Sequence, residues 1–159
     1  LCAIPGLGPT TVQQILFEIG GSVAAWPTVK QFCSWLALAP HHEISGGKVL
    51  RRQVRKTGNR GGQAFRMAAQ TLLRSPNNPL GAYSRRMRAR HGPERAIIAT
   101  AHKLARIFYH MLKHRMPFDP QQVTDDEQRS RQRKLTYLQR EAAKYGLALT
   151  TINPTLSPT

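Results

Sequence analysis

The chain has 159 residues, close to the size of one domain, and 40% of them are hydrophobic. That fraction is enough for a hydrophobic core, which excludes wholesale disorder. No run of about 18 apolar residues is present, which excludes a membrane-spanning helix, and no secretory signal opens the sequence. The two cysteines, Cys2 and Cys33, are too few for a disulfide framework or a zinc cluster, and they fit a reducing compartment.

The charge is strongly positive and unevenly placed. The chain has 24 Lys and Arg against 8 Asp and Glu, a formal net charge of +16. Between Ile44 and Arg115 stand 17 basic residues and one acid, Glu94, whereas 7 basic and 7 acidic residues cancel outside this window. Phosphates neutralise such charge and release counterions, so a nucleic acid is the leading partner. A membrane surface fits less well because the basic segments lack a broad apolar face; an ordinary solvated surface is the alternative.

Hydrophobic spacing and Pro/Gly punctuation predict helices nearly throughout, and hence an all-α fold. A first helix follows Pro9 and stops at Gly20-Gly21, and Pro27 is placed in the first turn of a second helix that ends before Pro40. Between 41 and 58 the helical periodicity disappears. This long basic loop is expected to be either extended or a short hairpin.

Four more helices are expected after this loop. The third runs from about Gly62 to Arg74, and a short one after Pro79 turns Leu80, Tyr83 and Met87 inward. A long helix from Pro93 has a basic face made of Arg95, His102, Arg106, His110 and Lys113.

The last expected helix spans about 124–145. It starts with the acids Asp125, Asp126 and Glu127 in its first turn, and it carries a narrow seam for docking onto a partner, made of Leu135, Leu138, Ala142 and Tyr145. An unstructured tail, TTINPTLSPT, follows. We expect a first domain at 1–118, followed by the docking helix and tail at 119–159.

The opening segment LCAIPGLGPTTVQQILFEIG resembles a helix-hairpin-helix motif. Gly6 and Gly8 allow a tight turn, and the N–H groups at the start of the following helix then face a phosphate of the DNA backbone. The alternative is that both glycines only make a compact turn between helices. Most of the motif's first helix would lie before Leu1, so we expect the chain to be a fragment of a longer protein.

Ser45 lies before Gly46-Gly47 in the basic loop and is followed closely by Lys48, Arg51 and Arg52. A serine hydroxyl becomes a nucleophile only with the help of a base or a metal, and arginines can stabilise charge on an attacked phosphodiester. From spacing alone, a serine that stabilises a turn is the more common case.

Across residues 1–118, several segments occur in the order typical of one family: IPGLG, FCSWLALAP, ISGGK, RKTGN, FRMAAQTL and ATAHKLARIFYHML. They resemble the C-terminal transposase domain of bacterial insertion-sequence transposases that carry an N-terminal RuvC-like DEDD domain, also known as bridge-RNA-guided recombinases. The resemblance implies that Ser45 is the nucleophile that attacks a DNA phosphodiester and is held in a covalent phosphoserine link until strand exchange.

The residues expected to contact nucleic acid are Gly6, Gly8, Gly46, Gly47, Lys48, Arg51, Arg52, Lys56, Asn59, Arg66 and Arg106. One departs from the family pattern. Many members place an arginine seven residues after the lysine that corresponds to Lys56, where this chain has Gln63. Arg66 is the nearest helix arginine, and Gly61-Gly62 is interpreted as a longer turn that displaces it.

The resemblance also implies partners and a metal. The metal-binding carboxylates, for Mg²⁺, would belong to the missing RuvC-like domain, and no metal or other cofactor is expected in this fragment. DNA, a guide RNA and further subunits of the same protein are expected as partners, in the bacterial cytoplasm at the nucleoid. We expect the fragment alone to bind nucleic acid without cutting it. The contrasting hypothesis is a non-enzymatic module that binds DNA or a structural RNA.

Overall fold

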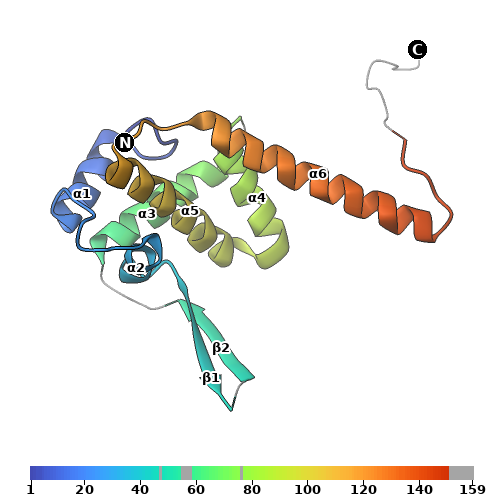
Figure 1. Ribbon diagram of the computed structural model, residues 1–159, viewed down its shortest axis with the longest axis horizontal. Helices are drawn as coiled ribbons and strands as arrows, with labels where there is room; N and C mark the ends of the chain where they lie inside the picture. Colours follow the sequence, from blue (N-terminus) through green and yellow to red (C-terminus); the bar gives the residue numbers. More distant parts are fainter. Residues whose placement is uncertain (47, 55–58, 76, 151–159) are drawn as a thin grey trace. The chain divides into compact units, whose positions relative to one another are not determined.

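The computed structural model describes residues 1–46, 48–54, 59–75 and 77–150, with the backbone only for 40–44 and 48–54. The chain divides into two compact units, Leu1–Pro120 and Gln121–Thr159. The described residues form six α-helices, which confirms the expected all-α class (Figure 1). The basic segment adds one two-stranded antiparallel hairpin to the first unit.

The first helix is confirmed, together with the glycines that stop it. α1 (Pro9–Ile19) starts with proline at a position where the missing N–H costs no hydrogen bond. It ends at Gly20, whose φ of 71° lies in the left-handed region. Its buried side chains, one helical turn apart, are Val12, Ile15 and Ile19.

The second helix starts later than its proline suggested. α2 (Val29–Trp35) is capped by Thr28, whose hydroxyl accepts a hydrogen bond from the Gln31 N–H at 3.3 Å. The Gln31 side chain accepts the Thr28 N–H at 3.1 Å in return, which completes a capping box. Pro27 therefore lies before the cap, and its expected place in the first turn is wrong.

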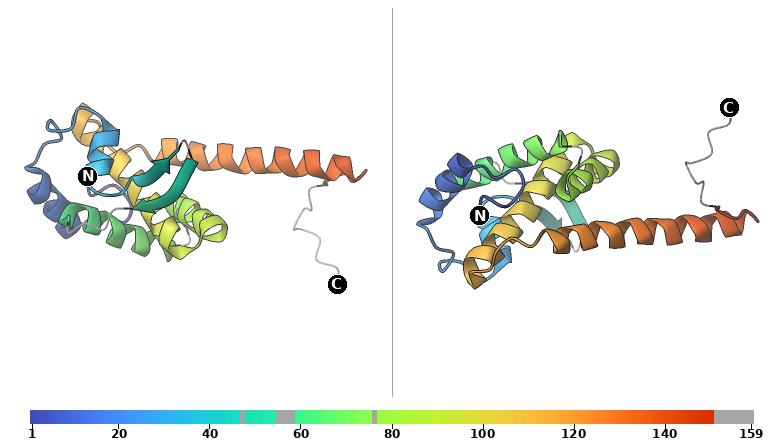
Figure 2. Two further views of the ribbon diagram at one scale, coloured as in Figure 1. Left: turned by 90° about the horizontal axis from the view of Figure 1, so that it is seen from below. Right: turned by 90° about the horizontal axis from the view of Figure 1, so that it is seen from above.

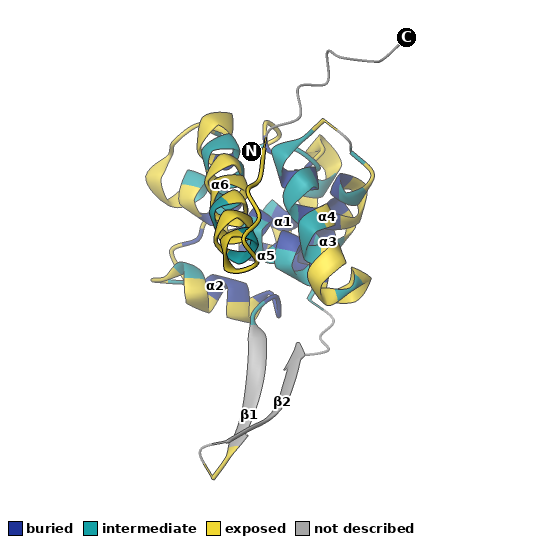
Figure 3. Ribbon diagram, turned by 90° about the vertical axis from the view of Figure 1, so that its right-hand side faces the viewer, coloured by how far each residue is buried: buried dark blue, intermediate teal, exposed yellow. Residues whose placement is uncertain are grey.

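The centre of the first unit is built by α3 (Arg60–Leu73) and α5 (Pro93–His114). Their fully buried rings Phe65 and Phe108 meet edge to face, with centroids 5.4 Å apart. α5 also contacts α2 and α4, and α3 contacts α1 (Figure 2). Figure 3 shows buried residues where these helices lie against one another.

The fourth helix packs through Leu80, which was expected to face inward, and through two small residues that were not. α4 (Pro79–His91) is capped by Asn78, and its buried residues are Leu80, Gly81 and Ser84. A Cβ on Gly81 would lie 2.5 Å from a carbonyl oxygen of the preceding loop, so only glycine allows this approach. Tyr83 and Met87, expected to face inward, are half-buried.

An aromatic cluster fixes the loop before α2 onto α5. The Tyr109 ring lies 5.5 Å from Phe32 between centroids, and its hydroxyl lies 2.9 Å from the carbonyl oxygen of Trp26 and 3.0 Å from that of Pro27. Lys113 donates to the Pro27 carbonyl at 2.6 Å as well. Lys113, expected on the basic face of this helix, therefore holds the loop in place.

The second unit is dominated by α6 (Pro120–Lys144). The helix starts four residues before position 124, because Pro120 suits the first turn of a helix. The expected acidic first turn is therefore wrong. In the seam, Leu135, Leu138 and Tyr145 are 44%, 40% and 78% exposed. Residues 151–159 of the expected tail lie outside the described residues.

Candidate nucleic-acid interface

The structure places Ser45 at the tip of the hairpin. β1 (Pro40–Ser45) pairs antiparallel with β2 (Lys48–Val54), and Ser45 stands opposite Lys48 in the register. Gly46 follows with a φ of 56°, the left-handed backbone that a two-residue hairpin connection needs and that glycine adopts readily. Ser45 and Gly46 are both exposed, so a macromolecule can reach the serine.

The hairpin changes register just below its tip. Glu43 stands opposite Arg51, but Ile44 stands opposite Val49, so Leu50 is an extra residue on β2. Such a bulge increases the local twist of a ribbon, and bulges are frequent near functional sites. Figure 1 shows the ribbon extending away from the helices of its unit, as a binding arm would.

The expected phosphate-binding residues of this segment are only partly described. The backbone places Lys48, Arg51 and Arg52 along β2, within seven residues of Ser45. Gly47 and Lys56 lie outside the described residues. The structure therefore brings Ser45 and three basic residues onto one short ribbon.

The base of the hairpin is held by the first turns of α3. The Asn59 side chain caps α3 by accepting the Gly62 N–H at 2.8 Å, and it donates to the Trp35 carbonyl at 3.3 Å. A Cβ on Gly62 would lie 2.2 Å from the Leu36 carbonyl oxygen, so this close approach requires glycine. Gly61 and Gly62 are helical, and their expected role in a longer turn is wrong.

Arg66 joins the same junction. Its Nη2 donates to the Ala37 carbonyl oxygen at 2.8 Å, and its side chain is half-buried. Arg66 and Asn59 were expected as phosphate contacts, but both bind the backbone at the end of α2. They position the segment that leads into β1. This role depends on tertiary contacts that no sequence spacing reveals.

Arg106 comes from a different element, in the middle of α5, and is exposed. Its positive charge acts on several neighbours. Burial raises the pKa of the Cys33 thiol to about 11, and Arg106 opposes that rise. Burial lowers the pKa of His102, and Arg106 lowers it further. Arg106 therefore contributes positive potential near residues of both α2 and α5, as a phosphate contact would require.

Tyr83 is a feature that the sequence reasoning assigned only to the core. The Lys103 Nζ lies 4.8 Å from the centroid of its ring, and the Arg86 Cζ lies 5.4 Å from it. Burial raises the pKa of Tyr83, while Arg86 and Arg106 oppose that rise. Tyr83 thus lies inside a basic cluster shared by α4 and α5. The i, i+3 spacing to Arg86 was the only sequence signal.

The two glycines of the opening segment have different surroundings. Gly6 has a φ of 87°, and a Cβ there would lie 3.0 Å from Leu72 Cγ. The turn and its close packing against α3 therefore explain why a glycine stands at this position. Gly8 is exposed, with no atom within 4 Å of such a Cβ. Gly8 precedes α1, which has no side-chain cap, so the start of α1 still suits a phosphate. Residues 1–8 form turns rather than a helix.

The donor chemistry of the described residues does not fit a metal centre. No three His, Cys, Asp or Glu side chains gather as metal ligands would in the described part of the chain. In the same residues, no helix is both long and apolar enough to cross a membrane.

These observations define the first unit as a small helical domain with a basic hairpin arm and an exposed serine at its tip. Residues 1–85 match the model of the Transposase IS116/IS110/IS902 family, and the chain belongs to this family. The match confirms the resemblance to the transposase domain noted from the sequence. No match was found among curated proteins or among solved structures.

Proposed function

We propose that this chain binds DNA and supplies Ser45 as the nucleophile for strand cleavage and exchange during transposition. The exposed position of Ser45 at the tip of the hairpin is the main support for this role. The membership in a transposase family gives the serine a reaction to perform. Lys48 stands opposite Ser45, and Arg51 and Arg52 follow on the same strand, so basic residues that could bind a phosphodiester lie on the ribbon that carries the serine.

The chemistry is a phosphoryl transfer without an external reactant. The Ser45 oxygen attacks the phosphorus of a DNA phosphodiester, a new Oγ–P bond forms, and one P–O bond to the sugar breaks. The serine proton ends on the departing sugar hydroxyl. In strand exchange, the hydroxyl of another DNA strand attacks the phosphoserine, restores a phosphodiester and returns the proton to Ser45.

Basic side chains from two elements, and the backbone N–H groups at the start of a third, would hold the DNA backbone during this reaction. Lys48, Arg51 and Arg52 lie on β2, Arg106 lies on α5, and Gly8 precedes the uncapped start of α1. Contacts of these kinds are made to phosphates and carry no sequence information of their own. The proposal therefore includes a guide RNA, which would determine the DNA sequence that is targeted.

The remaining expectations belong to the same proposal. A RuvC-like domain would carry the Mg²⁺ that helps activate Ser45, and several copies of the protein would assemble because recombination joins several strands. The protein would act at the bacterial nucleoid. On this proposal the isolated 159-residue chain, without the RuvC-like domain, binds DNA but does not cut it. A chain that only bound nucleic acid would be the alternative, and Ser45 would then have no chemical role.

The test is the formation of a covalent adduct. The transposase that carries this chain together with a RuvC-like domain is incubated with Mg²⁺ and labelled, nicked target DNA, and adducts are separated on a denaturing gel. We expect an adduct that Ser45→Ala abolishes and that Ser34→Ala, at an exposed serine of α2, leaves unchanged. An adduct that survives Ser45→Ala contradicts the proposal. Wild-type protein that binds the DNA without forming any adduct favours the non-enzymatic alternative.

A further inference from the structure

Four residues form a stripe along one face of α6, in the second unit. We infer that this Arg–Tyr stripe, made of Arg129, Arg133, Tyr137 and Arg140, binds a single-stranded nucleic acid. The arginines would contact successive phosphates, and Tyr137 would stack on a base. The inference is independent of the role proposed for Ser45, because no residue of the first unit takes part in it.

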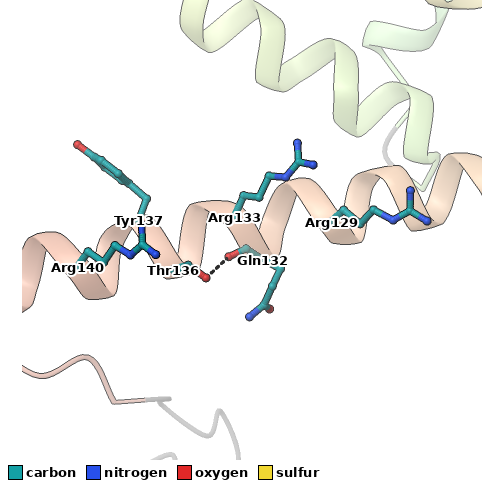
Figure 4. A pocket seen from close by; sticks show the side chains of 6 residues that line it. All are labelled: Arg129, Gln132, Arg133, Thr136, Tyr137 and Arg140. Carbon is teal, nitrogen blue, oxygen red and sulfur yellow. Dashed lines mark hydrogen bonds between the residues drawn. The ribbon is translucent and has the colours of Figure 1, made fainter.

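The stripe is a shaped surface. Its four side chains, with Gln132 and Thr136, line a hollow on the helix (Figure 4). The Thr136 hydroxyl donates to the Gln132 carbonyl at 3.1 Å, so this threonine is held against the helix backbone. Tyr137 is 61% exposed, and so its ring is open to a stacking partner. The hollow thus combines cations and an aromatic face.

The positive charge of this face is poorly compensated. Residues 128–140 contain five Lys and Arg and no acid. The nearest ion pair joins Arg129 to Asp126 across 3.9 Å, and both side chains are more than half exposed, so water screens it. Within the described part of the chain, Arg133 and Arg140 have no acidic partner within 4.0 Å. The stripe therefore attracts an anion from outside the helix.

The spacing points to a strand rather than to a single phosphate. Arg129 and Arg140 are eleven residues apart, which is about 16 Å along a helix. Such a length spans several nucleotides, and Tyr137 falls between two of the arginines. Interleaved cations and aromatic rings are the usual means of binding single strands, whose bases are free to stack. Arginine suits this task because its planar group contacts phosphates and also stacks.

Other occupants fit the stripe less well. A second copy of the helix would bring arginines against arginines, which repel. A membrane would need large apolar side chains on this face, but at about 100° per residue the seam residues Leu135, Leu138 and Tyr145 lie on the opposite side. The charge and the aromatic ring therefore favour a nucleic-acid strand.

The test maps a photocrosslink in the full 159-residue chain. Twelve-nucleotide single strands of RNA and of DNA, each substituted with 5-bromouracil, are irradiated with the protein, and crosslinked peptides are identified by mass spectrometry. We expect a crosslink at Tyr137. The double variant Arg133→Gln/Arg140→Gln should reduce its yield about tenfold, because the phosphate contacts are lost.

A matched control separates the stripe from the overall charge. Arg131→Gln removes one charge on the opposite side of α6 and should change the Tyr137 crosslink less than twofold, whereas Arg133→Gln alone should reduce it clearly. Equal losses in these two single variants overturn the inference, as do crosslinks that never map to Tyr137. The strand with the higher yield, RNA or DNA, identifies the natural ligand, and equal yields support a site that uses features common to both. A duplex that crosslinks to Tyr137 as well as either single strand overturns the assignment to single strands.

Discussion

The Nη2 of Arg66 donates a 2.8 Å hydrogen bond to the carbonyl oxygen of Ala37, 29 residues earlier in the chain. This bond ties α3 to the turn that precedes β1. Ala37 has a φ of 50°, a left-handed backbone that costs a residue with a β-carbon about 1–2 kcal/mol. A partner outside the turn therefore helps to hold the backbone from which the hairpin starts.

Replacing Arg66 should weaken this junction. Arg66→Met keeps most of the aliphatic stem but removes the donor, so the free energy of unfolding should fall by about 1–2 kcal/mol, less than for a fully buried charged hydrogen bond. Urea denaturation followed by circular dichroism measures the change. Arg74→Met, at an exposed arginine after the same helix, should stay within about 0.5 kcal/mol. Equal effects of the two substitutions would show that the bond to Ala37 adds no stability.

Gly62→Ala should disturb the same junction by sterics. Its Cβ would meet the Leu36 carbonyl oxygen at 2.2 Å, and backbone cannot move away as a flexible side chain would. We expect a loss of about 2–4 kcal/mol in the free energy of unfolding. Gly8→Ala, where such a Cβ meets no atom within 4 Å, should cost less than about 1 kcal/mol. The account of this contact fails if Gly62→Ala is as stable as Gly8→Ala.

Tyr109 offers a test of the loop before α2. Tyr109→Phe keeps the ring but removes the hydroxyl that lies against the Trp26 and Pro27 carbonyl oxygens and accepts from Lys113. Thermal and urea unfolding should show a loss of about 1 kcal/mol, because part-buried hydrogen bonds are lost while Lys113 still donates to the Pro27 carbonyl. Tyr145→Phe, at a tyrosine that is 78% exposed, serves as the control and should have no measurable effect. A Tyr109→Phe protein with wild-type stability would contradict these contacts.

The pH dependence of stability should carry a contribution from His102. Burial and the charge of Arg106 lower its pKa below the ordinary value of about 6.5. The unfolded chain therefore binds the proton at higher pH than the folded chain, so the free energy of unfolding should fall as the pH drops below about 6.5. His102→Gln should make this fall shallower in urea titrations at pH 7.5 and 5.0, and His91→Gln, at an exposed histidine of α4, should not. An unchanged slope in His102→Gln would refute the assignment.

The helices were largely predictable because their signals are local. Apolar residues at helical spacing after Pro9, and the glycines that follow, define α1 with its ends. Pro27 lies outside α2 because Thr28 and Gln31 form a capping box, which is a stronger start signal than a proline. For residues 41–58 the sequence left two options open, an extended loop or a short hairpin, because basic residues interrupt the alternation of polar and apolar residues that indicates a strand.

The part of the candidate site that is local in sequence could be predicted, whereas the partners of its more distant residues could not. Ser45, its glycines and the basic residues after it are neighbours in sequence, so the sequence brought them together. Asn59 and Arg66 were expected at the phosphates, yet both bind the end of α2. Their roles depend on how closely α3 approaches α2, which Gly62 permits. Such a contact joins residues far apart in sequence, so periodicity cannot reveal it.

The most direct test of the central claim is the identity of the residue bonded to DNA. The covalent adduct formed by the transposase and target DNA is digested with a nuclease and a protease, and the peptides are sequenced by mass spectrometry. The account predicts a nucleotide remnant attached through phosphate to Ser45, in the peptide that contains Ile44 and Gly46. A remnant attached to any other side chain would contradict it.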